Sequence, residues 1–91
     1  MSSYQLSFKN SAKKELSKLD YPMQQHIKKK LKTLADNYDS LSNNIKKLSG
    51  LDDLFRLRIA DYRVIFQKNE EKIYILIVRI GHRKEVYRNL N

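Results

Sequence analysis

The 91-residue chain predicts an α+β fold: a small antiparallel β-sheet with two N-terminal helices packed on one face, in the order β-α-α-β-β-β. Apolar residues recur every three or four positions between residues 12 and 34, which is typical of helices. Between residues 54 and 67 they alternate with polar residues, which is typical of strands. With 41% hydrophobic and 32% charged residues, the composition is that of a folded protein. We therefore expect one domain over residues 1–91.

The first half predicts one short strand followed by two helices. Alternating apolar residues indicate a strand over 4–8, and an apolar stripe indicates a helix over 12–19. Pro22 suits the first turn of the second helix, because its missing N–H needs no partner there. Asn37 is expected to end that helix in the left-handed conformation. The stripe of the second helix is spaced by four, four and three residues: Met23, Ile27, Leu31 and Leu34.

The second half predicts a connection followed by three strands. Residues 38–53 are rich in Ser, Asn and Asp and read as the connection, with a short extended piece at 46–50. Tight turns at 60–61 and 69–71 join the strands. The strands are expected at residues 54–59, 62–67 and 73–80.

Composition excludes several classes of protein. Only two glycines are present, so no glycine-rich phosphate loop can be written, and the absence of cysteine excludes thiol nucleophiles and Cys-ligated zinc. We expect no metal and no small-molecule cofactor. The longest apolar run, Ile73–Val78, is far shorter than the ~20 residues of a membrane helix, and the N-terminus does not resemble a signal peptide. A cytoplasmic protein without a membrane partner is expected.

The formal charge of +9 is divided unevenly between two types of cation. Residues 1–50 contain ten lysines and no arginine, whereas residues 51–91 contain six arginines and three lysines. Lysine is a solvated point charge, while the planar arginine fork binds phosphate in a fixed geometry. This pattern predicts a diffuse positive field on the first half and a shaped anion site on the second.

Position within the strands supports an anion site. Period-two alternation sends Arg56 and Arg58 to the face opposite the core, and Arg63 occupies the polar face of the neighbouring strand. Arg83 and Tyr87 follow the last strand. Like charges on adjacent strands repel one another, which is easier to understand if an anion lies between them.

These motifs resemble the RelE toxins of the bacterial RelE/ParE toxin–antitoxin superfamily. The resemblance covers almost the whole chain and includes the helix segment Ala12–Leu19, the segment Lys47–Gly50, and three later segments: Phe55–Ile59, Asp61–Phe66 and Gly81–Tyr87. It implies an endoribonuclease that enters the ribosomal A site, cuts mRNA there and inhibits translation. It also implies an acidic antitoxin, RelB-like or of another type, that silences the toxin.

The same resemblance implies roles for individual residues. The two basic positions of the first hairpin strand correspond to Arg56 and Arg58, the strand arginine to Arg63, the arginine after the last strand to Arg83, and the late tyrosine to Tyr87. Attack by a ribose 2′-OH builds charge on phosphorus, and Arg63 and Arg83 are our candidates to stabilise it. Tyr87 is expected to stack on a base or to orient the 2′-OH.

The identity of the general base is open. RelE members thought to use a lysine base have lysine where Arg56 and Arg58 stand here, and arginine, with a pKa above about 12, is a poor base. His82 and Asp61 are the substitutes to test, because imidazole titrates near neutrality and related nucleases use a carboxylate and a histidine. Asp61 is also explained as a simple turn residue, and His82 as a solvated loop residue. The other histidine, His26, is interpreted as a surface residue.

Other interpretations also stay open. Three lysines of the second helix have two interpretations: Lys28, Lys29 and Lys32. They form an ordinary solvated helix face, or they bind ribosomal RNA. Arg79 is expected to pair with an acid such as Glu85. The same fold also serves ParE, a poison of DNA gyrase, and a catalytically inactive member would act as a nucleic-acid-binding or antitoxin-binding module.

Overall fold

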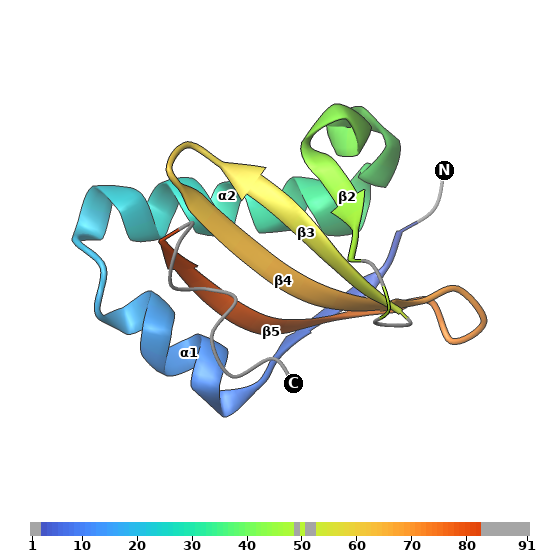
Figure 1. The fold of residues 1–91 in the computed structure, drawn as a ribbon, viewed down its shortest axis with the longest axis horizontal. Coiled ribbons are helices and arrows are strands. Elements are labelled where there is room, and N and C mark those ends of the chain that lie inside the picture. Colours follow the sequence, from blue (N-terminus) through green and yellow to red (C-terminus); the bar gives the residue numbers. More distant parts are fainter. Residues whose placement is uncertain (1–2, 49, 51–52, 83–91) are drawn as a thin grey trace.

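The computed structural model describes residues 3–48, 50 and 53–82, and these residues form one five-stranded sheet with helices on one side (Figure 1). The strand order across the sheet is β1-β5-β4-β3-β2. Within the described residues, no helix is both long enough and apolar enough to cross a membrane. The elements are β1 (Gln5–Phe8), α1 (Asn10–Ser17), α2 (Tyr21–Asp36), the 3₁₀ helix η1 (Tyr38–Asn44), β2 (Ile45–Lys47), β3 (Leu54–Ile59), β4 (Tyr62–Asn69) and β5 (Tyr74–His82).

The α+β class and the expected element order are confirmed, but the sheet is mixed rather than wholly antiparallel. β1 lies parallel to β5, while the other three pairs are antiparallel. The chain leaves β1 through two helices instead of a hairpin, and the neighbour of β1 is β5, the last described strand along the chain. Within the expected connection, the short extended piece predicted at 46–50 is present as the edge strand β2 at Ile45–Lys47, and the helix η1 was not predicted.

The hydrophobic core lies between the sheet and the two helices. The apolar stripe predicted for α2 is confirmed, since Ile27, Leu31 and Leu34 are fully buried. Phe66 on β4 is the largest fully buried side chain and stacks on Phe55, with ring centroids 5.6 Å apart. α2 therefore runs across one face of the sheet, and among the described residues no helix lies on the opposite face (Figure 1).

The sequence prediction for the ends of α2 is correct at the N-terminus and wrong at the C-terminus. Asp20 caps the N-terminus by accepting a hydrogen bond from the Met23 amide at 3.3 Å, and Pro22 stands in the first turn as predicted. At the other end Asn37 has φ −146°, so the expected left-handed terminator is wrong. The Asn37 amide instead donates to the Thr33 carbonyl at 2.7 Å, and the chain turns directly into η1.

α1 covers the edge of β5 beyond the point where β1 ends. The Ser11 hydroxyl donates to the Val78 carbonyl at 3.2 Å, and the Glu15 carboxylate accepts from the Ile80 amide at 2.8 Å. The same carboxylate accepts from Arg79 Nε and pairs with its Nη2, both at 2.9 Å. Arg79 therefore has an acidic partner as expected, but that partner is Glu15 on α1 and not Glu85, which lies outside the described residues.

An irregularity in the pairing of β4 with β5 sets which side chains share a face. Ile65 pairs with Arg79 and Phe66 pairs with Ile77, so Val78 is an extra residue of β5. Such a bulge reverses the alternation of every residue that follows it in the strand. Ile75 and Ile77 point into the core, and a regular strand would turn Ile80 to the opposite face. Because of the bulge, Ile80 also points into the core.

Candidate functional site

The face of the sheet opposite the helices carries a set of basic side chains from four strands. Leu57 and Val64 pair across β3 and β4 and are buried in the core, so their neighbours in each strand point the other way. We call this surface the arginine face; by strand register it holds Lys46, Arg56, Arg58, Arg63 and Arg79. The predicted convergence of Arg56, Arg58 and Arg63 on one face is confirmed, and Lys46 and Arg79 are additions.

The arginine face has two rows. In the first row Lys46, Arg56, Ile65 and Arg79 stand opposite one another across four strands, and Ile65 is fully buried although it is on this side of the sheet. In the second row Arg58 stands directly opposite Arg63. Like charges in directly opposite positions destabilise a sheet by several tenths of a kcal/mol or more, so this pair favours an anion between the two guanidinium groups.

The arginines of the face are held to different degrees. Arg63 is half-buried, and its Nη1 donates to the Tyr62 carbonyl at 3.2 Å and to the Ala60 carbonyl at 3.5 Å. Arg79 is held by Glu15. Arg58, in contrast, is exposed to solvent. The face thus combines positioned cations with an accessible one, which suits the binding of a phosphate group.

His82 is not brought to the arginine face. It pairs with Tyr62 across β4 and β5, and the two rings meet edge-on with centroids 5.8 Å apart. Since Tyr62 packs against the core, His82 lies on the helix side of the sheet. Asp61 is exposed in the turn between β3 and β4. Arg83 and Tyr87, the other two predicted site residues, lie outside the described residues.

The three lysines predicted to bind RNA lie on the other side of the molecule. Lys28, Lys29 and Lys32 are exposed on α2, which packs against the face of the sheet opposite the arginines. The structure therefore separates these three lysines from the arginine face. A partner that touches both must be large or must wrap around the protein.

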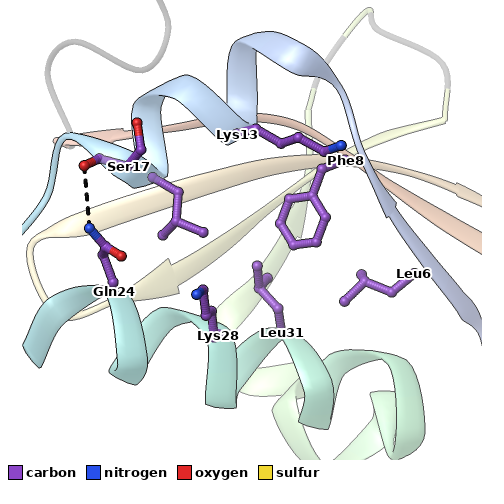
Figure 2. A pocket seen from close by; sticks show the side chains of 8 residues that line it. Leu6, Phe8, Lys13, Ser17, Gln24, Lys28 and Leu31 are labelled. Carbon is purple, nitrogen blue, oxygen red and sulfur yellow. Dashed lines mark hydrogen bonds between the residues drawn. The ribbon is translucent and has the colours of Figure 1, made fainter. Parts of the chain in front are cut away.

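A groove of about 430 Å³ lies between α1 and α2, and Lys28 is one of its lining residues. Figure 2 shows the side chains that line it. Gln24 reaches across it from α2 and donates to the Ser17 carbonyl at 3.3 Å. Lys13 and Lys28 contribute basic side chains from the two helices, and the apolar lining consists of Leu6, Phe8, Leu16 and Leu31. An apolar segment with acidic flanks fits such a groove.

Lys68, near the end of β4, lies against two aromatic rings. Lys68 Nζ lies 4.2 Å from the centroid of the Tyr38 ring and 5.0 Å from that of Phe55, and it pairs with Glu70 at 3.3 Å. Burial raises the pKa of Tyr38, against the opposing effect of Lys68. Burial alone would lower the pKa of Lys68, but the charge of Tyr38 and the hydrogen bond to Glu70 outweigh it and raise that pKa. This cluster stabilises the fold at a distance from the arginine face.

No group of three or more potential metal ligands occurs among His, Cys, Asp and Glu in the part of the chain that the structure describes. The chemistry of the arginine face is that of fixed positive charge. Guanidinium groups donate hydrogen bonds and stabilise negative charge, but they do not accept protons near neutral pH.

Comparison with known proteins identifies the family. The family model for the ParE toxin of the type II toxin–antitoxin system parDE matches residues 6–87. A RelE-like toxin protein of Escherichia coli is 37% identical over 83 residues, which are 89% of this chain and 84% of that protein. The chain belongs to the RelE/ParE toxin family. It is a toxin of a type II toxin–antitoxin system.

Further relatives of this RelE/ParE toxin carry the RelE name. The mRNA interferase toxin RelE of E. coli K12 is 33% identical over 88 residues, covering 92% of this chain and 90% of that protein. The toxin in the intact E. coli RelBE toxin–antitoxin complex superposes with a TM-score of 0.71 at 28% identity, covering 88% and 96% of the two chains. The resemblance inferred from the motifs is thereby confirmed, although the matching family model is named for ParE.

Proposed function

We propose that this toxin is an endoribonuclease that cleaves mRNA in the ribosomal A site and thereby inhibits translation. The observation that carries the proposal is the gathering of Arg56, Arg58 and Arg63 on one face of the sheet, with Arg58 opposite Arg63. The relative named mRNA interferase toxin RelE supports the same activity. Such a protein acts where ribosomes are, in the cytoplasm.

The proposed reaction is attack by a ribose 2′-oxygen on the adjacent phosphorus. A bond forms between the 2′-oxygen and phosphorus, and the bond from phosphorus to the 5′-oxygen breaks. The 2′-OH proton passes to solvent water, and the leaving 5′-oxygen takes a proton from water. Negative charge grows on the phosphoryl oxygens in the transition state. Arg58 and Arg63 approach from opposite strands and stabilise that charge.

Two further residues belong to the proposed site by resemblance alone. Arg83 is proposed as another cation for the same phosphate, and Tyr87 as the residue that stacks on a base or orients the 2′-OH. The site as proposed lacks an obvious base, because arginine is not deprotonated in proteins. His82 contacts Tyr62 on the other side of the sheet, so we leave it out of the catalytic set. Catalysis then depends mainly on fixed charge and on alignment of the RNA in the A site.

The helix side of the molecule is proposed to serve two partners. Lys28, Lys29 and Lys32 supply the positive field for ribosomal RNA, which makes ribosome binding steeply dependent on salt. A RelB-like antitoxin is the second proposed partner, since the structurally similar E. coli toxin is in a complex with its antitoxin. The apolar groove beside Lys13 and Lys28 suits an acidic protein with apolar side chains.

The experiment is a purified translation system programmed with a defined mRNA. Addition of the toxin should produce cuts within A-site codons, and a 2′-deoxy substitution at the attacking nucleotide should abolish the cut at that position. Lys72→Ala, in the exposed turn between β4 and β5, is the control and should cut like the wild type. Intact mRNA with fully active ribosomes would reject the proposal.

A second candidate function is poisoning of DNA gyrase by protein contact. The match to the family model for the ParE toxin favours it. This function does not require a phosphate site on the sheet, so alanine substitutions of Arg58 and Arg63 would leave toxicity unchanged. Arrested replication with intact mRNA in growing cells would indicate gyrase rather than the ribosome.

A further inference from the structure

A cavity opens where the edge of β3 extends past its short neighbour β2. β2 begins at Ile45, which pairs with Leu57, so the end of β3 has no strand beside it on that edge. A cavity of about 270 Å³ lies there, between α2, η1 and the turn after β3. Its polar lining comes from three separate elements: His26 and Lys30 of α2, Asn44 of η1 and Arg58 of β3.

The charge of this cavity favours an anion. Three basic residues line it, and none of its described lining residues is acidic. His26 is exposed and Lys30 is half-buried, so both side chains are within reach of a ligand from solvent. His26 and Arg58 are far apart along the chain, so their common cavity could not be predicted from the sequence. The fold brings them to one cavity.

The remaining lining matches the rest of a nucleotide. Leu41, Leu57 and Ile59 form the apolar floor of the cavity, where Leu41 keeps the largest exposed fraction at 8%, and Asn44 offers both a hydrogen-bond donor and an acceptor. Single-stranded RNA is recognised in this way, through apolar contact with an unstacked base and hydrogen bonds to its edges. A purely ionic site for a small anion would not need the apolar part.

Arg58 connects the cavity to the arginine face. It stands opposite Arg63 on that face and also lines the cavity. We propose that the cavity binds a nucleotide neighbouring the scissile phosphate, with Lys30 and His26 at its phosphate and with Asn44 and the apolar residues at its base. That this nucleotide belongs to the RNA substrate rests on the proposed function.

The test is an NMR titration of the full chain with a five-nucleotide single-stranded RNA whose 2′-oxygens are methylated, so that it cannot be cleaved. Binding should shift the Asn44 side-chain amide and the His26 ring signals. In the double variant His26→Ala/Lys30→Ala the shift of the Asn44 side-chain amide should vanish and the Kd should rise about tenfold, because charge-assisted hydrogen bonds to a phosphate are lost. Lys72→Ala removes a charge in the exposed turn before β5 and is the matched control, with less than a twofold change expected.

Parallel titrations with inorganic phosphate and adenosine 5′-monophosphate separate a phosphate site from a nucleotide site. The inference requires the nucleotide to bind more tightly than phosphate and to shift Asn44. Equal affinity for both ligands, or an unchanged Kd in the double variant with a wild-type thermal unfolding curve, overturns it. If the RNA binds in the cavity but the toxin leaves ribosomal mRNA intact, the cavity is a nucleotide site and the proposed function fails.

Discussion

Removing the carboxylate of Glu15 should destabilise the toxin more than an ordinary surface substitution. In Glu15→Ala the Ile80 amide at the edge of β5 loses its acceptor, which lies 2.8 Å away. The Arg79 guanidinium loses two contacts of 2.9 Å at the same time. The side chains of Arg79 and Glu15 are 20% and 26% exposed, so water replaces these contacts only in part.

The expected cost is about 2 kcal/mol. A hydrogen bond to a charged group contributes about 1.5–3 kcal/mol, and two groups lose such bonds here. Partial exposure screens the ion pair and lets water reach the freed groups, which brings the sum down to the lower part of that range. In a domain of this size 1 kcal/mol corresponds to about 4–8 °C in Tm, so Tm should fall by roughly 8–16 °C.

Urea unfolding of four variants separates the two contacts of Glu15. Glu15→Ala should cost more than Arg79→Ala, because only the first also frees the backbone of β5, and the double variant should show a coupling of about 1 kcal/mol. Glu70→Ala is the control: its side chain is 74% exposed, so its removal should cost less than about 0.5 kcal/mol. A cost for Glu15→Ala as small as that of Glu70→Ala would contradict the role given to α1 at the sheet edge.

Three further predictions concern stability. Folding raises the pKa values of both Tyr38 and Lys68, so their contribution to the free energy of unfolding is complete at neutral pH. It is lost as pH rises above their ordinary pKa values of 10.0 and 10.5. The urea midpoint should therefore fall above about pH 10, and it should fall less in Tyr38→Phe. Ala60 has φ 53°, a left-handed conformation that glycine adopts without strain, so Ala60→Gly should raise the free energy of unfolding by about 0.5–1 kcal/mol. A lower free energy of unfolding, measured by calorimetry, would contradict the turn geometry. Phe66→Ala should cost about 3–5 kcal/mol, and a wild-type Tm would place Phe66 outside the core.

The sequence was a good guide to local structure and to one face of the sheet. The spacing of Ile27, Leu31 and Leu34 predicts α2, because only a helix places these residues on one side. Alternation along β3 and β4 likewise places Arg56, Arg58 and Arg63 opposite the core. Both patterns depend on a fixed backbone period and need no knowledge of distant residues.

What the sequence did not reveal depends on pairing between distant segments. β1 pairs with β5, from which two α-helices, η1 and three strands separate it along the chain. The partner of Arg79 lies 64 residues earlier in the chain. The extra residue Val78 reverses the alternation of β5, which carries His82 to the helix side. The sequence of β5 does not locate the bulge, because isoleucine occurs on both alternations of this strand: Ile75 and Ile77 on one, and Ile80 on the other. The cavity joining His26 to Arg58 likewise arises only from tertiary packing.

Single-turnover cleavage of A-site mRNA on programmed ribosomes is the most direct measurement of the proposed activity. Wild type, Arg58→Ala and Arg63→Ala should be compared at saturating toxin, with circular dichroism to show that each variant is folded. Removing one preorganised cation from a phosphoryl transition state should lower the rate constant about 10²–10³-fold. Equal rate constants for the wild type and both arginine variants would contradict the proposal that the arginine face carries out the cleavage.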